Sequence, residues 1–154
     1  MSRCWLMKSE PGAYSIDDLE RDGTTCWDGV RNYQARNLMR EMKEGDAVLF
    51  YHSNANPPGV VGIARVSREA YPDPTSWDPN GRYFDPKSSP EAPRWWMVDI
   101  AFVEKLPRTV PLSELKADPA LEEMLVTGKS RLSVQPVEQP HFDWVVGLAR
   151  EEEA

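Results

Sequence analysis

Two β-rich segments separated by a run of turn-forming residues place the strongest constraint on the fold of this chain. Residues 47–52 and 60–66 are rich in valine, leucine, isoleucine and aromatic side chains, which suit extended backbone. Between them lies Ser53-Asn54-Ala55-Asn56-Pro57-Pro58-Gly59, in which most residues favour a turn. The pattern predicts a β-hairpin or a close relative of one.

Other segments predict the remaining sheet and the fold class. Further strands are expected near residues 5–9, 95–105 and 133–137. Strands that close on themselves with helices packed outside predict an α+β fold, a small partly open β-barrel of about five to six strands with peripheral helices.

Cap residues and apolar spacing predict the helices. Ser15 is a predicted cap for a short helix that ends near Gly23, and Asn32 caps a helix that Gly45 stops. Shorter helical pieces are expected over 111–116 and 119–126, and a terminal helix over 138–150 with this buried stripe: Phe142, Val145, Val146 and Ala149. Trp5, Trp96 and Trp144 lie in regular patterns, so we expect them in the core.

Length and charge limit the organisation of the chain. At 154 residues the chain is the size of one ordinary domain, which we expect to span residues 1–150. The net charge is −7, and Glu151, Glu152 and Glu153 supply three of the negative charges, so residues 151–154 are expected to form a disordered acidic tail. An acidic body argues against sequence-blind coating of duplex phosphates, but not against holding one nucleotide in a pocket.

The two cysteines and two histidines indicate neither a disulfide scaffold nor a metal site. Cys4, Cys26, His52 and His141 lie in separate elements without ligand spacing, so no metal and no cofactor are expected. No apolar leader precedes Trp5 and no apolar stretch is long enough to span a membrane. We therefore expect a soluble monomer without membrane contact, cytoplasmic, or nuclear if the source is eukaryotic.

One segment combines aromatic, cationic and amide side chains just before a predicted helix. It is Trp27-Asp28-Gly29-Val30-Arg31-Asn32-Tyr33-Gln34-Ala35-Arg36-Asn37. An indole face can stack on a base, which contributes about 1–3 kcal/mol, while amide and guanidinium groups serve its polar edge. Trp27 either faces a ligand or joins the core. Residues 27–43 carry four cations against two carboxylates, which indicates either a place for phosphate or a solvated helix face.

Residues 71–93 contain six prolines together with Trp77, Tyr83 and Phe84. This composition cannot form a regular element, so we expect a long ordered loop, and loops of this length tend to be functional.

Five blocks in order resemble the EVE domain family, and the resemblance extends from Trp5 to about Leu148. These blocks are Trp-Leu-Met-Lys-Ser-Glu-Pro at 5–11, residues 27–37, Phe-Tyr-His-Ser-Asn at 50–54, Glu-Ala-Tyr-Pro-Asp at 69–73 and Arg-Leu-Ser-Val-Gln-Pro at 131–136. The resemblance implies a PUA-like barrel that reads modified bases in nucleic acid, related to the YTH readers of methylated adenine.

The same resemblance implies a set of pocket residues. Lys8 and Ser9 match a strand-end pair, and Trp27 matches the tryptophan that forms one wall of the YTH cage. Seven further residues match positions around the pocket: Arg31, Asn32, Tyr51, His52, Ser53, Arg131 and Ser133. Arg31 and Arg131 are expected to meet phosphate, and Asn32 and Ser53 the polar edge of the base. The second aromatic wall is expected to be Tyr71, Trp77 or Trp95.

These observations predict a non-catalytic reader of a modified base in DNA or RNA, presented single-stranded or flipped out of a duplex. Motifs for a serine nucleophile, a phosphate-binding lysine loop and a dinucleotide fold are absent, and nothing in the spacing requires a nucleophile made of Cys26 and His52. Two alternatives remain open: a hydrolase of modified nucleosides that uses Lys8 and Glu10 with His52 nearby, and a protein-interaction module that uses the proline-rich loop.

Overall fold

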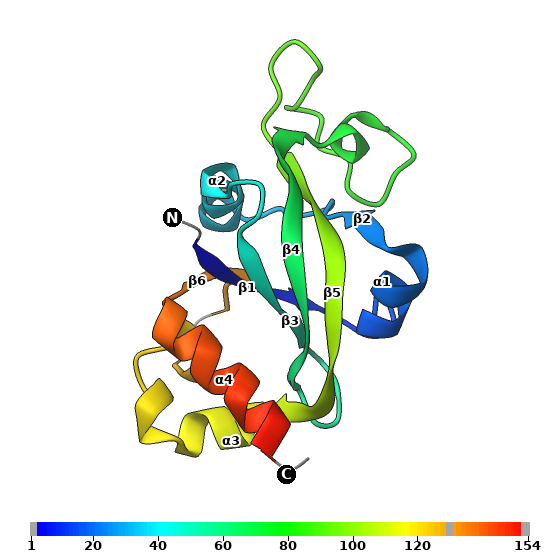
Figure 1. Cartoon of the computed structure of the whole chain (residues 1–154). Coiled ribbons are helices and arrows are strands. Elements are labelled where there is room, and N and C mark those ends of the chain that lie inside the picture. Colours follow the sequence, from blue (N-terminus) through cyan, green and yellow to red (C-terminus); the bar gives the residue numbers. More distant parts are fainter. Residues whose placement is uncertain (1–2, 129–130, 152–154) are drawn as a thin grey trace.

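The computed structural model describes residues 3–128 and 131–151. Its centre is one six-stranded sheet in the order β2-β5-β4-β3-β1-β6 (Figure 1). The strands are β1 (Cys4–Ser9), β2 (Thr24–Cys26), β3 (Ala47–His52), β4 (Gly59–Pro72), β5 (Trp96–Pro111) and β6 (Val134–Val137). β1 and β3 are parallel and the other neighbours antiparallel. The predicted α+β class with five to six strands is confirmed, and the sheet is mixed and open.

The predicted hairpin is the pair β3 and β4, but β4 and β5 are longer than their sequence patterns. β4 continues to Pro72 and β5 to Pro111, past the exposed polar residues that end the apolar alternation. Register shifts interrupt the β4–β5 pairing at several points, and such bulges let a strand bend and continue. The three-residue strand β2 was not predicted, because its sequence, Thr24-Thr25-Cys26, is too short to carry a pattern.

Side-chain bonds set the helix starts. The helices are α1 (Ile16–Asp22), α2 (Tyr33–Glu41), α3 (Leu112–Ala117) and α4 (Gln139–Glu151), with 3-10 turns at Pro74–Trp77, Pro119–Leu121 and Leu125–Thr127. Ser15 and Asp18 form a capping box at α1, and Asn32 accepts a hydrogen bond from the Ala35 amide at α2. Both predicted caps are confirmed, although α2 ends at Glu41, before Gly45.

Alternation along the central strands separates two apolar clusters. In β1, Trp5 and Met7 pack on the face that α1 and α2 cover, while Cys4 and Leu6 pack on the other face with α3 and α4. The predicted burial of Trp5 is confirmed, and its indole N–H donates to Asp46 at 2.9 Å. Trp96 is only half-buried.

The predicted burial of Trp144 is wrong, because its side chain is 50% exposed and its indole N–H donates to Asp118. The predicted stripe of α4 is buried, and Trp144 lies on the other side of the helix. Glu151 is the last residue of α4 rather than part of a tail, and residues 152–154 lie outside the described residues. Over the described ranges no helix has the length and apolarity needed to cross a membrane.

The predicted long loop joins β4 to β5 and projects beyond the sheet at the top of Figure 1. Buried Asp73, Ser76 and Ser88 hold it from within: the Ser76 hydroxyl donates to the carbonyl of Asp73 at 2.9 Å and lies 3.1 Å from the Ser88 hydroxyl. The Trp95 indole N–H donates to Asp85 at 2.7 Å. This polar interior orders a segment that contains almost no regular structure.

Candidate functional site

A cavity of about 700 Å³ lies where segments far apart in the sequence meet, on the side of the sheet that α1 and α2 cover. This volume suits a small organic ligand. Its lining comes from the end of β1, from β2, from residues 27–32 and from the β4–β5 loop: Lys8, Ser9, Glu10, Ala13, Tyr14, Thr25, Cys26, Trp27, Asp28, Gly29, Val30, Arg31, Asn32, Arg82, Tyr83 and Ser133.

Six of the residues that the sequence nominated line this cavity: Lys8, Ser9, Trp27, Arg31, Asn32 and Ser133. The backbone explains part of this convergence. β1 ends at Ser9 beside the last strand, and the Lys8 amide donates to the Ser133 carbonyl at 2.8 Å. The pairing of β1 with β3 and β6 thus brings a segment near each end of the chain to one edge of the cavity.

Trp27 belongs both to the cavity wall and to the core. Its side chain is 8% exposed, and its ring meets Phe50 edge to face at 5.6 Å between centroids. Its amide donates to the Val98 carbonyl at 2.7 Å, which anchors the segment to β5. The indole is therefore held rigidly by apolar packing while part of it borders the cavity.

Another aromatic residue at the cavity is Tyr83, which the sequence did not nominate. Its ring packs against Gly29, which has a φ of +77°, and a Cβ at Gly29 would lie 2.6 Å from Tyr83 Cζ. The close approach of the ring therefore requires glycine at this position. Tyr83 was visible in the sequence only as one aromatic residue of a proline-rich loop, and no local pattern places it beside Gly29.

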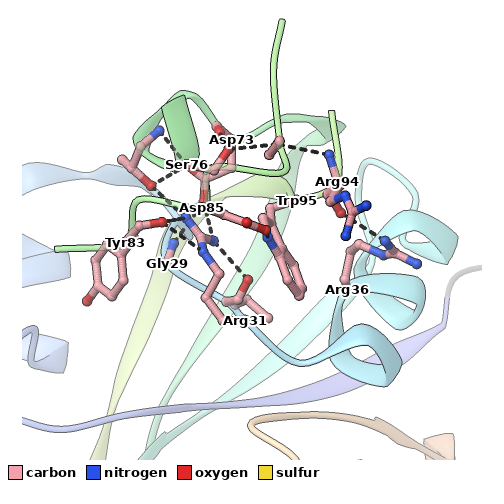
Figure 2. A network of polar contacts seen from close by, with 12 residues as sticks. Gly29, Arg31, Arg36, Asp73, Ser76, Tyr83, Asp85, Arg94 and Trp95 are labelled. Carbon is pink, nitrogen blue, oxygen red and sulfur yellow. Dashed lines mark hydrogen bonds and ion pairs between the residues drawn. The ribbon is translucent and has the colours of Figure 1, made fainter. Parts of the chain in front are cut away.

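Arg31 holds the β4–β5 loop, which carries Tyr83, in place through hydrogen bonds (Figure 2). Its Nε and Nη2 donate to the Tyr83 carbonyl at 3.1 and 2.7 Å, and Nη2 also donates to the Thr75 hydroxyl. Its Nη1 donates to the Val30 carbonyl at 2.9 Å and to the Asp73 carboxylate at 3.1 Å. All five N–H groups of the guanidinium are used. The guanidinium of Arg31 therefore has no N–H group left for the phosphate contact that the sequence predicted.

Asp73 is the buried centre of this network, with no exposed surface. Its carboxylate accepts hydrogen bonds from the Gly29 amide, the Thr75 amide and hydroxyl, and Arg31. Burial alone raises the pKa of Asp73, but hydrogen bonds from Thr75, Gly29 and Arg31 outweigh it and hold the pKa below its ordinary value. The ionised carboxylate thereby ties residues 29–31 to the start of the loop.

The surroundings of two residues in the cavity lining, Asp28 and Lys8, shift their pKa values. Burial, and secondly the Asp73 charge, raises the pKa of Asp28. Burial lowers the pKa of Lys8, whose ammonium lies 5.7 Å from the centroid of the Tyr51 ring. Asn32 caps α2 with its amide oxygen, so its amide nitrogen is the group left for a ligand.

Three predicted residues that follow one another in the chain do not line the cavity. Tyr51 is buried in the apolar cluster on the opposite face, because β3 alternates and the Phe50 ring faces Trp27. His52 Nε2 accepts a hydrogen bond from the Ile16 amide at 3.1 Å, and burial lowers its pKa. The Ser53 amide donates to the Ser9 carbonyl, so Ser53 supports the edge of the cavity through its backbone.

Four other nominated residues also lie outside the cavity lining. The Tyr71 hydroxyl donates to Asp99, and Arg68 covers its ring at 3.6 Å, so Tyr71 belongs to the β4–β5 sheet. Trp95 is buried and stacks on Tyr33. Trp77 is half-buried in the loop, and Arg131 is exposed outside the lining. None of the three nominated aromatic walls lines the cavity, whereas Tyr83 does.

No group of three or more His, Cys, Asp or Glu side chains within the described ranges is arranged to hold a metal ion. Cys26 lines the cavity as a free thiol whose pKa is raised, first by burial and then by the charges of Asp28 and Asp99. A protonated thiol is a poor nucleophile and a poor metal ligand.

Comparison with known proteins identifies the relatives of this arrangement. A model described as the EVE domain matches residues 3–148. Human thymocyte nuclear protein 1 is 43% identical over 171 residues, which cover 99% of this chain and 76% of that protein. A hypothetical protein from Leishmania major has a TM-score of 0.96 at 47% identity, covering 100% of this chain and 98% of the other.

Two solved structures similar to this chain were determined with nucleic acid. Human THYN1 in complex with DNA containing 5-methylcytosine has a TM-score of 0.91 at 44% identity, covering 97% of this chain and 99% of that one. The YTH domain of Zygosaccharomyces rouxii MRB1, in complex with N6-methyladenosine RNA, has a TM-score of 0.56 at 19% identity over 97% of this chain and 88% of the other. The second likeness concerns the fold alone.

Proposed function

Because this chain belongs to the EVE domain family, we propose that its cavity binds one modified nucleobase of a nucleic acid, as a reader without catalytic activity. The observation that carries the proposal is that aromatic residues, among them Trp27 and Tyr83, line one cavity of about 700 Å³ together with charged and amide groups. The human relative was solved with 5-methylcytosine DNA. We extend that ligand class to this chain and propose methylated cytosine.

The aromatic residues supply the stacking surface. A base that enters the cavity must leave its stack, which costs a few kcal/mol in a duplex and less in a single strand. Contact with an aromatic ring restores about 1–3 kcal/mol per base. Trp27 is held by Phe50, and Tyr83 by Gly29 and Arg31, so little ordering remains to be done when the base binds.

Asp28 discriminates cytosine from thymine and uracil. A carboxylate accepts a hydrogen bond from the exocyclic amine of cytosine, whereas the corresponding position of thymine or uracil is a carbonyl oxygen that a carboxylate repels. Asp28 lines the cavity, and no side-chain partner satisfies its carboxylate within the described residues. The amide nitrogen of Asn32 is a donor that suits a ring nitrogen or carbonyl of the base.

The hydrolase alternative rests on Lys8 and Glu10, which both line the cavity. Burial lowers the pKa of Lys8, which is a property of some catalytic lysines. However, the Glu10 carboxylate accepts a hydrogen bond from the Asn54 amide at 2.6 Å, and the Nε2 atom of His52 is engaged by the backbone. Neither human relative named above has a catalytic name. We therefore favour binding of a modified base over hydrolysis of a nucleoside as the function of this cavity.

Two further properties complete the proposal. Residues 1–150 act as one domain and the protein binds as a monomer. The human relative carries a nuclear name, so a nuclear location is proposed if the source is eukaryotic, and a cytoplasmic one otherwise.

The test is titration of fluorescent single-stranded oligonucleotides that differ only in one central base: 5-methylcytosine, cytosine or thymine. The proposal expects tightest binding to 5-methylcytosine and weakest to thymine, with RNA and duplex DNA of the same sequence measured alongside. Incubation with a panel of free modified nucleosides, followed by chromatography, measures turnover. Equal affinity for all three bases would overturn the reader function, and release of free base would favour the hydrolase.

A further inference from the structure

We propose that the exposed side of α2, together with the start of β5, binds the phosphates of the nucleotides that flank the base in the cavity. This α2 arginine surface consists of Tyr33, Arg36, Arg40, Arg94 and Trp96. The inference rests on the proposed function and extends it from one base to a strand.

The first part of the surface is an aromatic stack that holds two arginines. The rings of Tyr33 and Trp95 are stacked, with 4.7 Å between centroids and 21° between planes, and Tyr33 is 50% exposed. The guanidinium carbon of Arg36 lies 4.7 Å from the Tyr33 centroid, and its Nη1 donates to the Arg94 carbonyl (Figure 2). Arg94 in turn reaches the Tyr33 hydroxyl at 3.4 Å.

Arg40 repeats this arrangement one helical turn later. Its guanidinium carbon lies 4.6 Å from the centroid of the half-buried Trp96 ring. Residues four apart project from the same side of a helix, so Arg36 and Arg40 present their charges in one row. An aromatic ring orients a guanidinium while N–H groups that are not otherwise bonded stay able to donate, which is the arrangement suited to phosphate. Arg36 donates three of its five N–H groups to Asn37 Oδ1 and the Arg94 carbonyl, which leaves two for a phosphate.

The arginines of this surface are not neutralised by the protein. Elsewhere in the described ranges, six arginines and lysines form ion pairs with carboxylates, as in Arg3–Glu41, Arg31–Asp73 and Arg108–Glu114, while other single cations such as Arg65 and Lys116 do not. Over those same ranges, no carboxylate lies within 4.0 Å of the guanidinium nitrogens of Arg36, Arg40 or Arg94. In a chain with a net charge of −7, three clustered unpaired arginines indicate an anionic partner.

The surface is continuous with the cavity. Asn32 lines the cavity and Tyr33, the next residue, begins the stack. Trp95 lies within 5.3 Å of the Arg31 guanidinium on the cavity side and within 5.9 Å of Arg36 on the other. A strand whose base occupies the cavity therefore has a short path to the arginines. This continuity, together with exposed ring surface next to the charges, favours a nucleic acid over an acidic peptide.

The test compares a short and a long probe. The double variant R36Q/R40Q is compared with wild type and with R65Q/K116Q, which removes the same two charges from exposed positions on β4 and α3. The short probe is the nucleoside 5-methyl-2′-deoxycytidine, measured by calorimetry. The long probe is a labelled 11-nucleotide single strand with one central 5-methylcytosine, titrated at several salt concentrations, and thermal melting checks that all variants are folded.

We expect R36Q/R40Q to bind the nucleoside as wild type does and the 11-mer about 10- to 30-fold more weakly at 0.1 M salt, with a salt slope flatter by about 1.4, which is the value for two contacts to a single strand. The control variant keeps both affinities. If R36Q/R40Q binds the nucleoside and its affinity for the 11-mer and its salt slope equal those of wild type, this inference is overturned while the proposed function stands.

Two further outcomes separate the proposals. If the 11-mer binds through the arginines equally well with cytosine or 5-methylcytosine and the nucleoside does not bind, the reader function fails and the surface stands. Competition by a hexaglutamate peptide as effective as by an unmodified oligonucleotide would assign the surface to acidic peptides and overturn the inference.

Discussion

The ring of Tyr83 lies against the α-carbon of Gly29, so closely that a Cβ at Gly29 would come within 2.9 Å of three of its ring atoms. The two residues belong to different segments that line the cavity, and the network centred on Asp73 and Arg31 connects them. The position of Tyr83 therefore depends on a contact that only glycine permits.

Gly29→Ala is expected to displace Tyr83 and weaken binding of a 5-methylcytosine oligonucleotide by about 1–3 kcal/mol, which is the value of one stacking contact. Because φ at Gly29 is +77°, an alanine there is strained in the folded state, which should lower the free energy of unfolding by about 1–2 kcal/mol. Fluorescence titration and urea denaturation measure the two effects. The control is Gly147→Ala in α4, where the added Cβ meets nothing within 4 Å, so that binding should not change and stability should rise by about 0.5–1 kcal/mol.

Tyr83→Ala is expected to weaken the same binding by about 1–3 kcal/mol without changing its salt dependence, because stacking releases no counterions. Stability should change little, since Tyr83 is partly exposed. Trp27→Ala should reduce both binding and stability, the latter by about 3–5 kcal/mol, because Trp27 is also part of the core. Tyr83→Phe keeps the ring and serves as the control. Unaltered affinity of Tyr83→Ala would remove Tyr83 from the binding site.

Arg31→Ala is expected to lower the free energy of unfolding by about 3–5 kcal/mol, because it leaves the buried Asp73 carboxylate without its ion-pair partner. The salt slope of oligonucleotide binding should stay the same, since the guanidinium hydrogen bonds are used within the protein. Arg21→Ala, which breaks exposed pairs with Asp18 and Asp22, should cost no more than about 1 kcal/mol. A salt slope flatter by about one unit in Arg31→Ala would restore the phosphate role.

The raised pKa of Asp28 gives binding a pH dependence of defined sign. As pH falls through this raised pKa, the carboxylate gains a proton, the hydrogen-bond acceptor for cytosine is lost, and binding should weaken. Because the folded state disfavours the ionised form, Asp28→Asn should also increase the free energy of unfolding at neutral pH and have no such effect at acid pH. Titrations and denaturation between about pH 4 and pH 8 span the ordinary carboxyl range.

Asp28→Asn is itself the control for the pH dependence of binding, since it removes the titrating group and its curve should be flat. A pH dependence that persists unchanged in this variant would assign it to another group and remove Asp28 from base recognition.

The elements that the sequence predicted correctly are those held by short-range interactions. Ser15 caps α1 through Asp18, three residues away, and the alternation of β3 and the stripe of α4 are periodic patterns readable in one segment. Family resemblance added the residues at the cavity whose backbone position is set by β1 and its neighbours, Lys8 and Ser9.

The second cavity wall, the role of Arg31 and the exposure of Trp144 were decided by tertiary structure. Tyr83 comes from a loop without periodicity, and it reaches Gly29 only because Asp73, buried at the end of β4, binds both the Gly29 amide and Arg31. The sequence by itself determined local hydrogen bonds and apolar periodicity, since these involve residues a few positions apart. Which distant side chains share a cavity depended on how the loop packs, because a buried carboxylate is stable only where several distant donors converge on it.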